Sequence, residues 1–163
     1  MQFLTIQRKI CSFAEAEKRV KQWQSKGYTV VFTNGCFDIL HYGHIHYLAE
    51  ARDLGHKLVV GLNSAASVKR LKGEHRPIND EATRQALLAA LSMIDMVVVF
   101  EEDTPYNLIK TLVPNILVKG GDWSPSQIVG SDVVLANGGM VKSLPFIEGY
   151  STTNIEAKIR SWT

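Results

Sequence analysis

Two histidines, His41 and His44, stand three residues apart in a His-x-Gly-His sequence. Residues 30–44 read VVFTNGCFDILHYGH, so an apolar run breaks at a Gly turn shortly before these histidines. Side chains three apart on the first turn of a helix project from nearly the same face. Gly43 between them lets a ligand approach the backbone closely. Imidazole N–H groups at a helix N-terminus would stabilise charge on phosphate oxygens during in-line displacement, so the pattern predicts a phosphate-handling site.

A zinc site is the main alternative for these histidines. Metalloenzyme histidine pairs usually lie at i and i+4 and are completed by a third ligand. His46 is the only nearby candidate for a third ligand, and its side chain would point elsewhere. We therefore expect no metal ligation by this pair. Cys36 has no residue nearby that looks like its base, so we interpret it as a small buried side chain.

Asp38 follows the Gly-Cys-Phe turn and has two possible roles. Its carboxylate could cap the helix that begins near Gly43. It could instead lie near the phosphates, where a carboxylate is useful if it orients a donor or holds Mg²⁺.

Four basic residues follow the second predicted strand. Lys69 and Lys72 stand three apart at the end of a predicted helix, where lysines are common for dipole reasons alone. Because this helix follows the second strand, the pair could also contact phosphate. Arg76 and Arg84 are weaker candidates, and we interpret Arg76 mainly as a solvated surface arginine.

Two further segments come after predicted strands late in the chain. Lys119 is followed by Gly-Gly and Asp122, which is either a simple turn or a place where Asp122 accepts from a ribose hydroxyl or a base. Residues 149–153 read GYSTT, and Ser151 or a neighbouring threonine would cap the final helix. The same N–H groups and hydroxyls could hold a β- or γ-phosphate, so the two roles are compatible.

Strands alternate with helices along the chain, and the strands are continuous apolar runs rich in β-branched residues. Ser12 and Glu15 form a capping box for the first predicted helix, and Gly27 ends it. This pattern predicts a Rossmann-like, doubly wound α/β fold with a parallel sheet covered on both faces. We expect a single domain, 1–163, with an N-terminal helix at about 12–26 and a core at about 28–163. The expected strands are 30–33, 57–62, 95–100, 116–119 and 140–144, and the expected helices are 13–25, 43–54, 65–71, 80–92, 105–112, 131–136 and 151–160.

Composition narrows the class of protein further. The chain has 163 residues, 45% of them hydrophobic, which is enough for a substantial core. A net charge of +2 argues against a nucleic-acid binder, whose domain is usually far more basic. No apolar run approaches the roughly 18 residues of a membrane span. Two cysteines without metal or disulfide spacing fit a reducing cytoplasm.

Four motifs in order resemble the nucleotidylyltransferase superfamily marked by His-x-Gly-His, which includes the small cytidylyltransferases. They run from Thr33 to Thr153 and read GCFDILHYGH, SVKRLKG, KGGDW and GYSTTNI. Longer stretches, FTNGCFDILHYGH, VVGLNSAASVKRLKGEHRP and VKGGDW, are similar to the adenylyltransferase half of the ADP-heptose synthases. The resemblance implies the nucleotidylyltransferase fold.

The resemblance also implies a reaction. ATP and D-glycero-β-D-manno-heptose 1-phosphate would give ADP-heptose and pyrophosphate, with Mg²⁺, for the lipopolysaccharide inner core. The sugar phosphate would attack the α-phosphorus directly, without a covalent enzyme intermediate. The implied catalytic residues are His41, His44, Lys69 and Lys72. The implied nucleotide-binding residues are Thr33, Asn34, Gly35, Phe37, Asp38, Gly43, Lys119, Gly121, Asp122, Ser151, Thr152 and Thr153, and the substrate-binding residues are Asn63 and Arg76.

Some features depart from the pattern. Cytidylyltransferases carry RTEGIST before the last helix, and its arginine contacts the nucleotide. The corresponding stretch here, residues 146–152, reads FIEGYST and lacks that arginine, which disfavours CTP. Family members are often fused to a sugar kinase, but this chain has no room for one, so we expect a stand-alone transferase with a separate heptose kinase. Because dimers are common in the family, we also expect a homodimer. The alternatives are a glycerol-3-phosphate cytidylyltransferase, an FMN adenylyltransferase, or a nucleotide-binding module without turnover.

Overall fold

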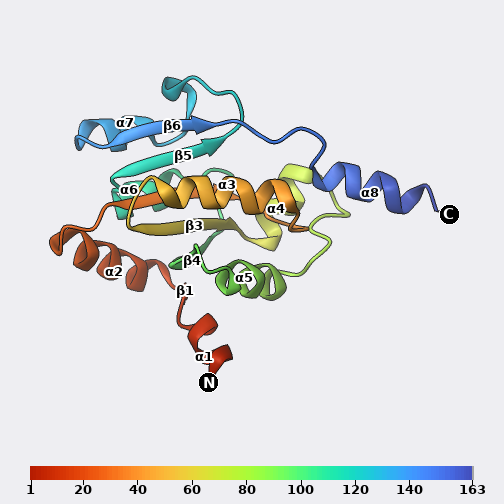
Figure 1. The fold of residues 1–163 in the computed structure, drawn as a ribbon, viewed down its shortest axis with the longest axis horizontal. Helices are drawn as coiled ribbons and strands as arrows, with labels where there is room; N and C mark the ends of the chain where they lie inside the picture. The colour runs from red at the N-terminus through yellow and green to blue at the C-terminus, as the bar shows by residue number, and fades with distance from the viewer. Residues whose placement is uncertain (163) are drawn as a thin grey trace.

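A six-stranded sheet forms the centre of the computed structural model, which describes residues 1–162 (Figure 1). The strand order is β1-β4-β3-β2-β5-β6, and every neighbouring pair is parallel. The expected doubly wound α/β fold is therefore confirmed. The strands are β1 (Ile10–Cys11), β2 (Val30–Gly35), β3 (Lys57–Asn63), β4 (Met96–Phe100), β5 (Ile116–Gly120) and β6 (Met140–Leu144).

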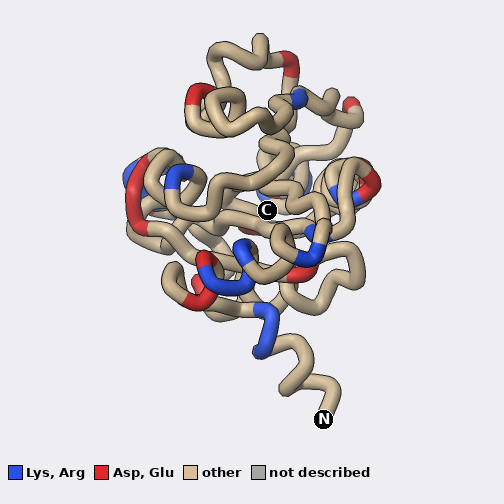
Figure 2. Tube along the Cα trace, turned by 90° about the vertical axis from the view of Figure 1, so that its left-hand side faces the viewer, with Lys and Arg blue, Asp and Glu red and all other residues tan. Residues whose placement is uncertain are grey.

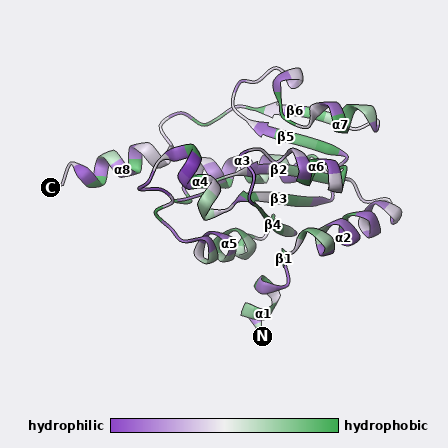
Figure 3. Cartoon of the chain, turned by 180° about the vertical axis from the view of Figure 1, so that it is seen from behind, coloured by the Kyte–Doolittle hydropathy of each residue, from purple (hydrophilic) through white to green (hydrophobic). Residues whose placement is uncertain are grey.

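Helices cover both faces of this sheet and form two apolar cores. One core joins Val20, Phe32, Leu108 and Val134, so α2, α6 and α7 lie on that face. The other core joins Tyr47, Leu48, Val60 and Leu88, so α3 and α5 lie on the opposite face. Figure 3 shows the hydrophobic strands between helices of mixed hydropathy. The helices are α1 (Gln2–Gln7), α2 (Phe13–Ser25), α3 (Tyr42–Asp53), α4 (Ala65–Lys72), α5 (Glu81–Ala90), α6 (Tyr106–Leu112), the short 3₁₀ helix η1 (Pro125–Gln127), α7 (Ser131–Ala136) and α8 (Thr152–Arg160).

The direction of winding reverses between β2 and β5. From β2 the chain moves to β3 and then β4 on one side, whereas β5 and β6 pair on the other side of β2. In open α/β sheets, ligands bind outside the carboxyl ends of the strands at such a switch point. The segments after β2, β3, β4 and β5 are therefore the ones that the fold brings together.

Helix starts are capped by side chains, as predicted for Ser12 and Ser151. The Ser12–Glu15 capping box is present, and Ser64, Asp80 and Ser151 each accept a hydrogen bond from a backbone N–H of the helix they precede. Pro105 differs slightly, because it occupies the N-cap of α6 instead of its first turn. Three short elements, α1, β1 and η1, were not predicted, since pieces of two to six residues carry little periodicity.

Charged residues of both signs are interspersed along the chain trace, without one continuous basic face in the view of Figure 2. Within residues 1–162, none of the helices combines the length and the apolar character that a membrane span needs.

Two ends of the chain project from the sheet. The short α1 extends on one side, and α8 extends from the edge where the strands end (Figure 1).

Candidate functional site

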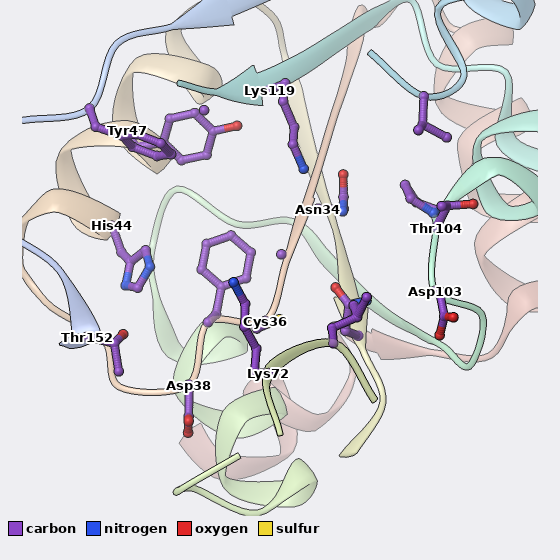
Figure 4. A pocket seen from close by; sticks show the side chains of 18 of the residues that line it. Asn34, Cys36, Asp38, His44, Tyr47, Lys72, Asp103, Thr104, Lys119 and Thr152 are labelled. Carbon is purple, nitrogen blue, oxygen red and sulfur yellow. The ribbon is translucent and has the colours of Figure 1, made fainter. Parts of the chain in front are cut away.

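A pocket of about 650 Å³ opens at the carboxyl ends of the strands. Its lining comes from the segments after β2, β3, β4 and β5 and from the start of α8. Figure 4 shows His44 and Thr152 on one side of this pocket, Asp103 and Thr104 on the other, and Lys119 and Asn34 between them. The predicted residues that line it are Asn34, Gly35, Phe37, Asp38, His44, Asn63, Lys72, Arg76, Lys119, Thr152 and Thr153.

The two histidines meet at the start of α3. His41 is the N-cap of this helix, and its Nδ1 accepts a hydrogen bond from the backbone N–H of His44 at 3.4 Å. The two rings stack with their centroids 3.8 Å apart. Only His44 lines the pocket, and Phe37 packs edge-on against it with ring centroids 5.2 Å apart. His41 therefore supports His44 from behind while also capping the helix.

Both imidazoles are held in the neutral form. Burial lowers the pKa of His44 to about 4, and the neighbouring His41 contributes in the same direction. Burial also lowers the pKa of His41. The Nδ1 atom of His44 is buried and has no protein hydrogen-bond partner among residues 1–162. A neutral imidazole is a donor through one nitrogen and an acceptor through the other. The single N–H of His44 can therefore donate either to the backbone of Ile39, an interaction that raises the pKa of His44, or to a phosphate oxygen.

The turn after β2 has an unusual backbone at Phe37. Its φ is +43°, in the left-handed region that non-glycine residues rarely adopt. The Phe37 ring lies against Gly35, where a Cβ would come within 2.9 Å of it. The glycine thus allows the ring to close over the turn and to form part of the pocket wall next to His44.

Asp38 binds a neighbouring loop and caps no helix. Its carboxylate accepts hydrogen bonds from the backbone N–H groups of Ile78 and Asn79, each at 2.8 Å, and from Arg76 Nε at 2.7 Å. Burial alone would raise the pKa of Asp38, but these hydrogen bonds lower it overall. The interpretation of Asp38 as a helix cap was wrong, because the loop before α5 supplies all of its donors. The interpretation of Arg76 as a solvated arginine was also wrong, since its side chain is 17% exposed and it reaches Glu156 as well, at 3.7 Å.

Arg84 lies beneath the same turn and is fully buried. Its Nη1 donates to the carbonyl oxygens of Cys36 at 2.9 Å and of Asn63 at 2.8 Å, which joins the ends of β2 and β3. Burial lowers the pKa of Arg84, against the opposing effect of Asp38. The sequence analysis gave this arginine little weight. Its position shows that it organises the floor of the pocket.

The lysines separate into two groups. Lys69 forms an ion pair with Glu74 and lies outside the pocket. Lys72 and Lys119 both line the pocket, and neither has a hydrogen bond or an ion pair with any residue in the described part of the chain. Burial lowers the pKa of Lys119, and Lys72 adds to this effect. The structure therefore brings Lys72, but not Lys69, to the predicted site.

Several other predicted nucleotide-binding residues lie at the border of the pocket or outside it. Thr33 is fully buried, and its hydroxyl pairs with that of Tyr47 at 2.6 Å. Ser151 caps α8, whereas Thr152 and Thr153 line the pocket. Asp122 is exposed and points no group into the lining. Gly121 and Gly43 are also outside the lining, and a Cβ at Gly43 would come within 3.1 Å of Tyr150 and 3.2 Å of the His41 ring.

The sequence analysis missed part of the lining. Tyr47 follows His44 by three positions on α3, so helical spacing alone could have identified it. Asp103 and Thr104 follow the carboxyl end of β4, another position that the fold class points to. Cys36 also lines the pocket and is only partly buried, and burial raises the pKa of its thiol. The other missed residues are Leu71, Gly120, Trp123, Gln127, Ile128, Val129, Pro105 and Phe146.

No metal-binding cluster accompanies the pocket. Among residues 1–162, no three His, Cys, Asp or Glu side chains gather as metal ligands would. The two carboxylates of the pocket are both engaged, Asp38 by Arg76 and Asp103 by Arg70.

Known proteins are similar to this chain in sequence and in fold. Bifunctional protein HldE of Geotalea uraniireducens is 56% identical over 142 residues, which cover 87% of this chain and 29% of that protein. Bifunctional protein HldE of Actinobacillus pleuropneumoniae is 55% identical over 147 residues, 90% of this chain and 31% of that protein. The chain thus spans about a third of the length of these relatives.

Two solved structures illustrate the range of the fold. A lipopolysaccharide core biosynthesis protein from Thermoplasma volcanium is 32% identical, with a TM-score of 0.61 over 77% of this chain and 100% of that one. A pantothenate synthetase from Thermus thermophilus is 16% identical with a TM-score of 0.63, over 93% of this chain and 70% of that one, and so shares the fold alone. Residues 32–158 match the sequence profile of the cytidylyltransferase-like family. With the identity to its relatives, this match shows that the chain belongs to the cytidylyltransferase-like family of nucleotidyltransferases.

Proposed function

We propose that this chain is an adenylyltransferase. It transfers AMP from ATP to a sugar 1-phosphate, D-glycero-β-D-manno-heptose 1-phosphate, and releases ADP-heptose and pyrophosphate for the lipopolysaccharide inner core. The observation that carries the proposal is the neutral His41–His44 pair at the N-terminus of α3, in a pocket with two unpaired lysines. More than half of the residues aligned with the HldE proteins are identical, and the Thermoplasma relative is a lipopolysaccharide core biosynthesis protein.

The chemistry needs positioning and charge stabilisation more than covalent participation. An oxygen of the acceptor phosphate attacks the α-phosphorus, and the bond from this phosphorus to the bridging oxygen breaks as pyrophosphate leaves. His44 donates an N–H to a phosphate oxygen, and the free N–H groups at the start of α3 add positive potential there. Lys72 neutralises charge on the triphosphate, and Thr152 and Thr153 hold the nucleotide at the start of α8.

Magnesium enters this proposal only with the nucleotide. Mg²⁺ usually keeps several waters and binds through one or two carboxylates together with substrate phosphates. The pocket carboxylates Asp38 and Asp103 are both paired with arginines, so the described residues do not form a protein cage for the ion.

The same activity bears on the enzyme upstream, the cellular compartment and the oligomeric state of the protein. A sugar kinase activity supplies the acceptor, since the reaction consumes a sugar that is already phosphorylated. The chain acts in the cytoplasm, in keeping with its two free cysteines. The protein is a homodimer, in keeping with the exposed Ile159 and Trp162 of the C-terminal segment, and sedimentation velocity would test this by giving the mass of two chains.

Pyrophosphate release tests the reaction directly. The purified protein is mixed with Mg²⁺, with ATP or CTP in turn, and with or without the β-anomer of heptose 1-phosphate. Release with ATP alone, and only when the sugar phosphate is present, is the expected result. Turnover with CTP and glycerol 3-phosphate, or with ATP and FMN, would assign one of those acceptors instead. ATP binding without turnover on any acceptor would replace the proposal with a nucleotide-binding module.

A further inference from the structure

The pocket lies across the edge of the sheet, and its two sides belong to different helical layers. His44 comes from α3, which packs in the core that contains Tyr47 and Leu48. Lys119 follows Leu117 by two positions on β5 and so shares its face of the sheet. Leu117 packs with Leu108 of α6, in the opposite core. Lys119 and the histidines therefore approach the pocket from opposite sides of the sheet.

Asn34 belongs to the side of Lys119. It follows Phe32 by two positions on β2, and Phe32 lies in the same core as Leu117. In Figure 4 the side chains of Asn34 and Lys119 point toward one another across the middle of the pocket. An ammonium group and a side-chain amide at one place form a suitable set of partners for the oxygens of one anion.

The charge of the pocket comes from its two free lysines. Arg76 is neutralised by Asp38, and the pocket histidine is neutral. Asp103 is paired with Arg70. Among the charged side chains that line the pocket, Lys72 and Lys119 form no ion pair with any residue in the described part of the chain. Two such groups in one pocket favour two anionic ligands or one highly charged ligand.

Polar side chains continue beyond Lys119. Thr104 and Asp103 from the segment before α6 and Gln127 from η1 line the pocket on this side. Hydroxyl, amide and carboxylate side chains are the usual partners of sugar hydroxyls. The polar part of this wall is thus suited to a polyhydroxylated molecule, and the apolar Pro105, Ile128 and Val129 lie beside it in the lining.

In-line displacement requires the attacking group and the leaving group to lie on opposite sides of the reacting phosphorus. We propose that Lys119 binds the phosphate of the acceptor, which occupies the side of the pocket lined by Thr104 and Gln127, whereas the pyrophosphate leaves on the histidine side. This rests on the proposed transferase function and changes the role of Lys119, which the sequence analysis grouped with the nucleotide-binding residues. Lys119 becomes a specificity determinant for phosphorylated sugars.

The test compares Lys119→Met and Lys119→Arg with Lys110→Met, an exposed lysine near the end of α6. Calorimetry measures the binding of ATP alone and of heptose 1-phosphate alone, and steady-state kinetics gives KM for each. We expect Lys119→Met to weaken acceptor binding and raise its KM by about 10- to 100-fold, the scale of a lost hydrogen bond to a charged group. The affinity for ATP should change less than about threefold. Lys119→Arg should recover part of the acceptor affinity, and Lys110→Met should match the unmodified protein.

The outcomes separate this inference from the proposed function. Weaker ATP binding with unchanged acceptor binding would overturn the role of Lys119, even if the enzyme is an adenylyltransferase. Absence of turnover in the unmodified protein would refute the proposed function, but the calorimetry would still decide the inference. In that case, loss of sugar phosphate binding in the Lys119→Met variant would support the acceptor subsite. Binding that persists in this variant would overturn it. If the unmodified protein binds no sugar phosphate, the inference is overturned as well.

Discussion

The imidazole rings of His41 and His44 stack with their centroids 3.8 Å apart and their planes inclined by 21°. A positive charge on either ring would face the other ring at this separation, and both are also partly removed from water. The arrangement therefore keeps the pair neutral at pH 7. One histidine caps α3 and the other faces the pocket, so one short motif provides both the helix cap and a pocket-lining imidazole.

Replacing His44 by alanine should reduce kcat by about 100-fold or more, because the transition state loses one preorganised donor. The rate is measured by pyrophosphate release at saturating ATP and acceptor. His46→Ala is a suitable control, since His46 lies outside the pocket and contacts Glu50. Near-normal turnover of a well-folded His44→Ala protein would exclude the assigned role.

Acid should destabilise the protein in two separate ranges of pH. The pKa of His44 falls from its usual 6.5 to about 4 on folding, so between these values the unfolded chain binds the proton more readily. The contribution of His44 to stability is thus complete above about 6.5 and is lost as the pH falls toward about 4. Asp38, whose pKa is also lowered, loses its contribution only at still lower pH. Urea unfolding across pH 4 to 7 measures the slope, and His44→Gln should flatten it in the upper range. An equal slope in the variant would contradict the assignment.

Replacing the buried Arg84 by methionine should lower the free energy of unfolding by about 2–4 kcal/mol, because the carbonyls of Cys36 and Asn63 lose their donor. The measurement is urea unfolding followed by circular dichroism. Arg160→Met provides a surface comparison, since Arg160 pairs with Glu156 on exposed α8 and should contribute less than about 1 kcal/mol. Similar losses in the two variants would mean that Arg84 does not hold the turn.

Asp38 and Arg76 should behave as one unit. Asp38→Asn leaves Arg76 without its buried partner and should cost about 3 kcal/mol of stability. A double-mutant cycle with Arg76→Gln should give an interaction free energy of about 1–3 kcal/mol. Additive losses would show that the loop before α5 is held by the backbone hydrogen bonds of Ile78 and Asn79 alone.

The fold could be predicted from the sequence because its signals are local. Apolar runs such as Val30–Gly35 and caps such as Ser12, Ser64 and Asp80 specify strands and helix starts within a few residues. Parallel winding then follows from the alternation of the elements. The short α1 and β1 have too few residues to show a period, and β1 is defined mainly by its pairing with β4.

The site was only partly predictable for a different reason. Motif residues close together in the sequence, such as Gly35, Phe37 and His44, line one pocket because their short spacing fixes their geometry. Asp38, Arg76 and Arg84 were misjudged because their partners lie about 20 to 50 positions away in the sequence. Helical spacing could not distinguish Lys69 from Lys72, whereas the structure pairs Lys69 with Glu74 outside the pocket and places Lys72 in its lining.

The weak attachment of the last helix affects the affinity of the pocket for its ligands. α8 has no buried residue, and its attachments are the Arg76–Glu156 ion pair and the contact of the preceding Tyr150 ring with Tyr42. Its first residues, Thr152 and Thr153, nevertheless line the pocket. The measured affinity for a nucleotide therefore combines the intrinsic contacts with the fraction of molecules in which α8 is seated. Sequence changes on the outer face of α8 can then adjust substrate affinity without altering any group that touches a phosphate.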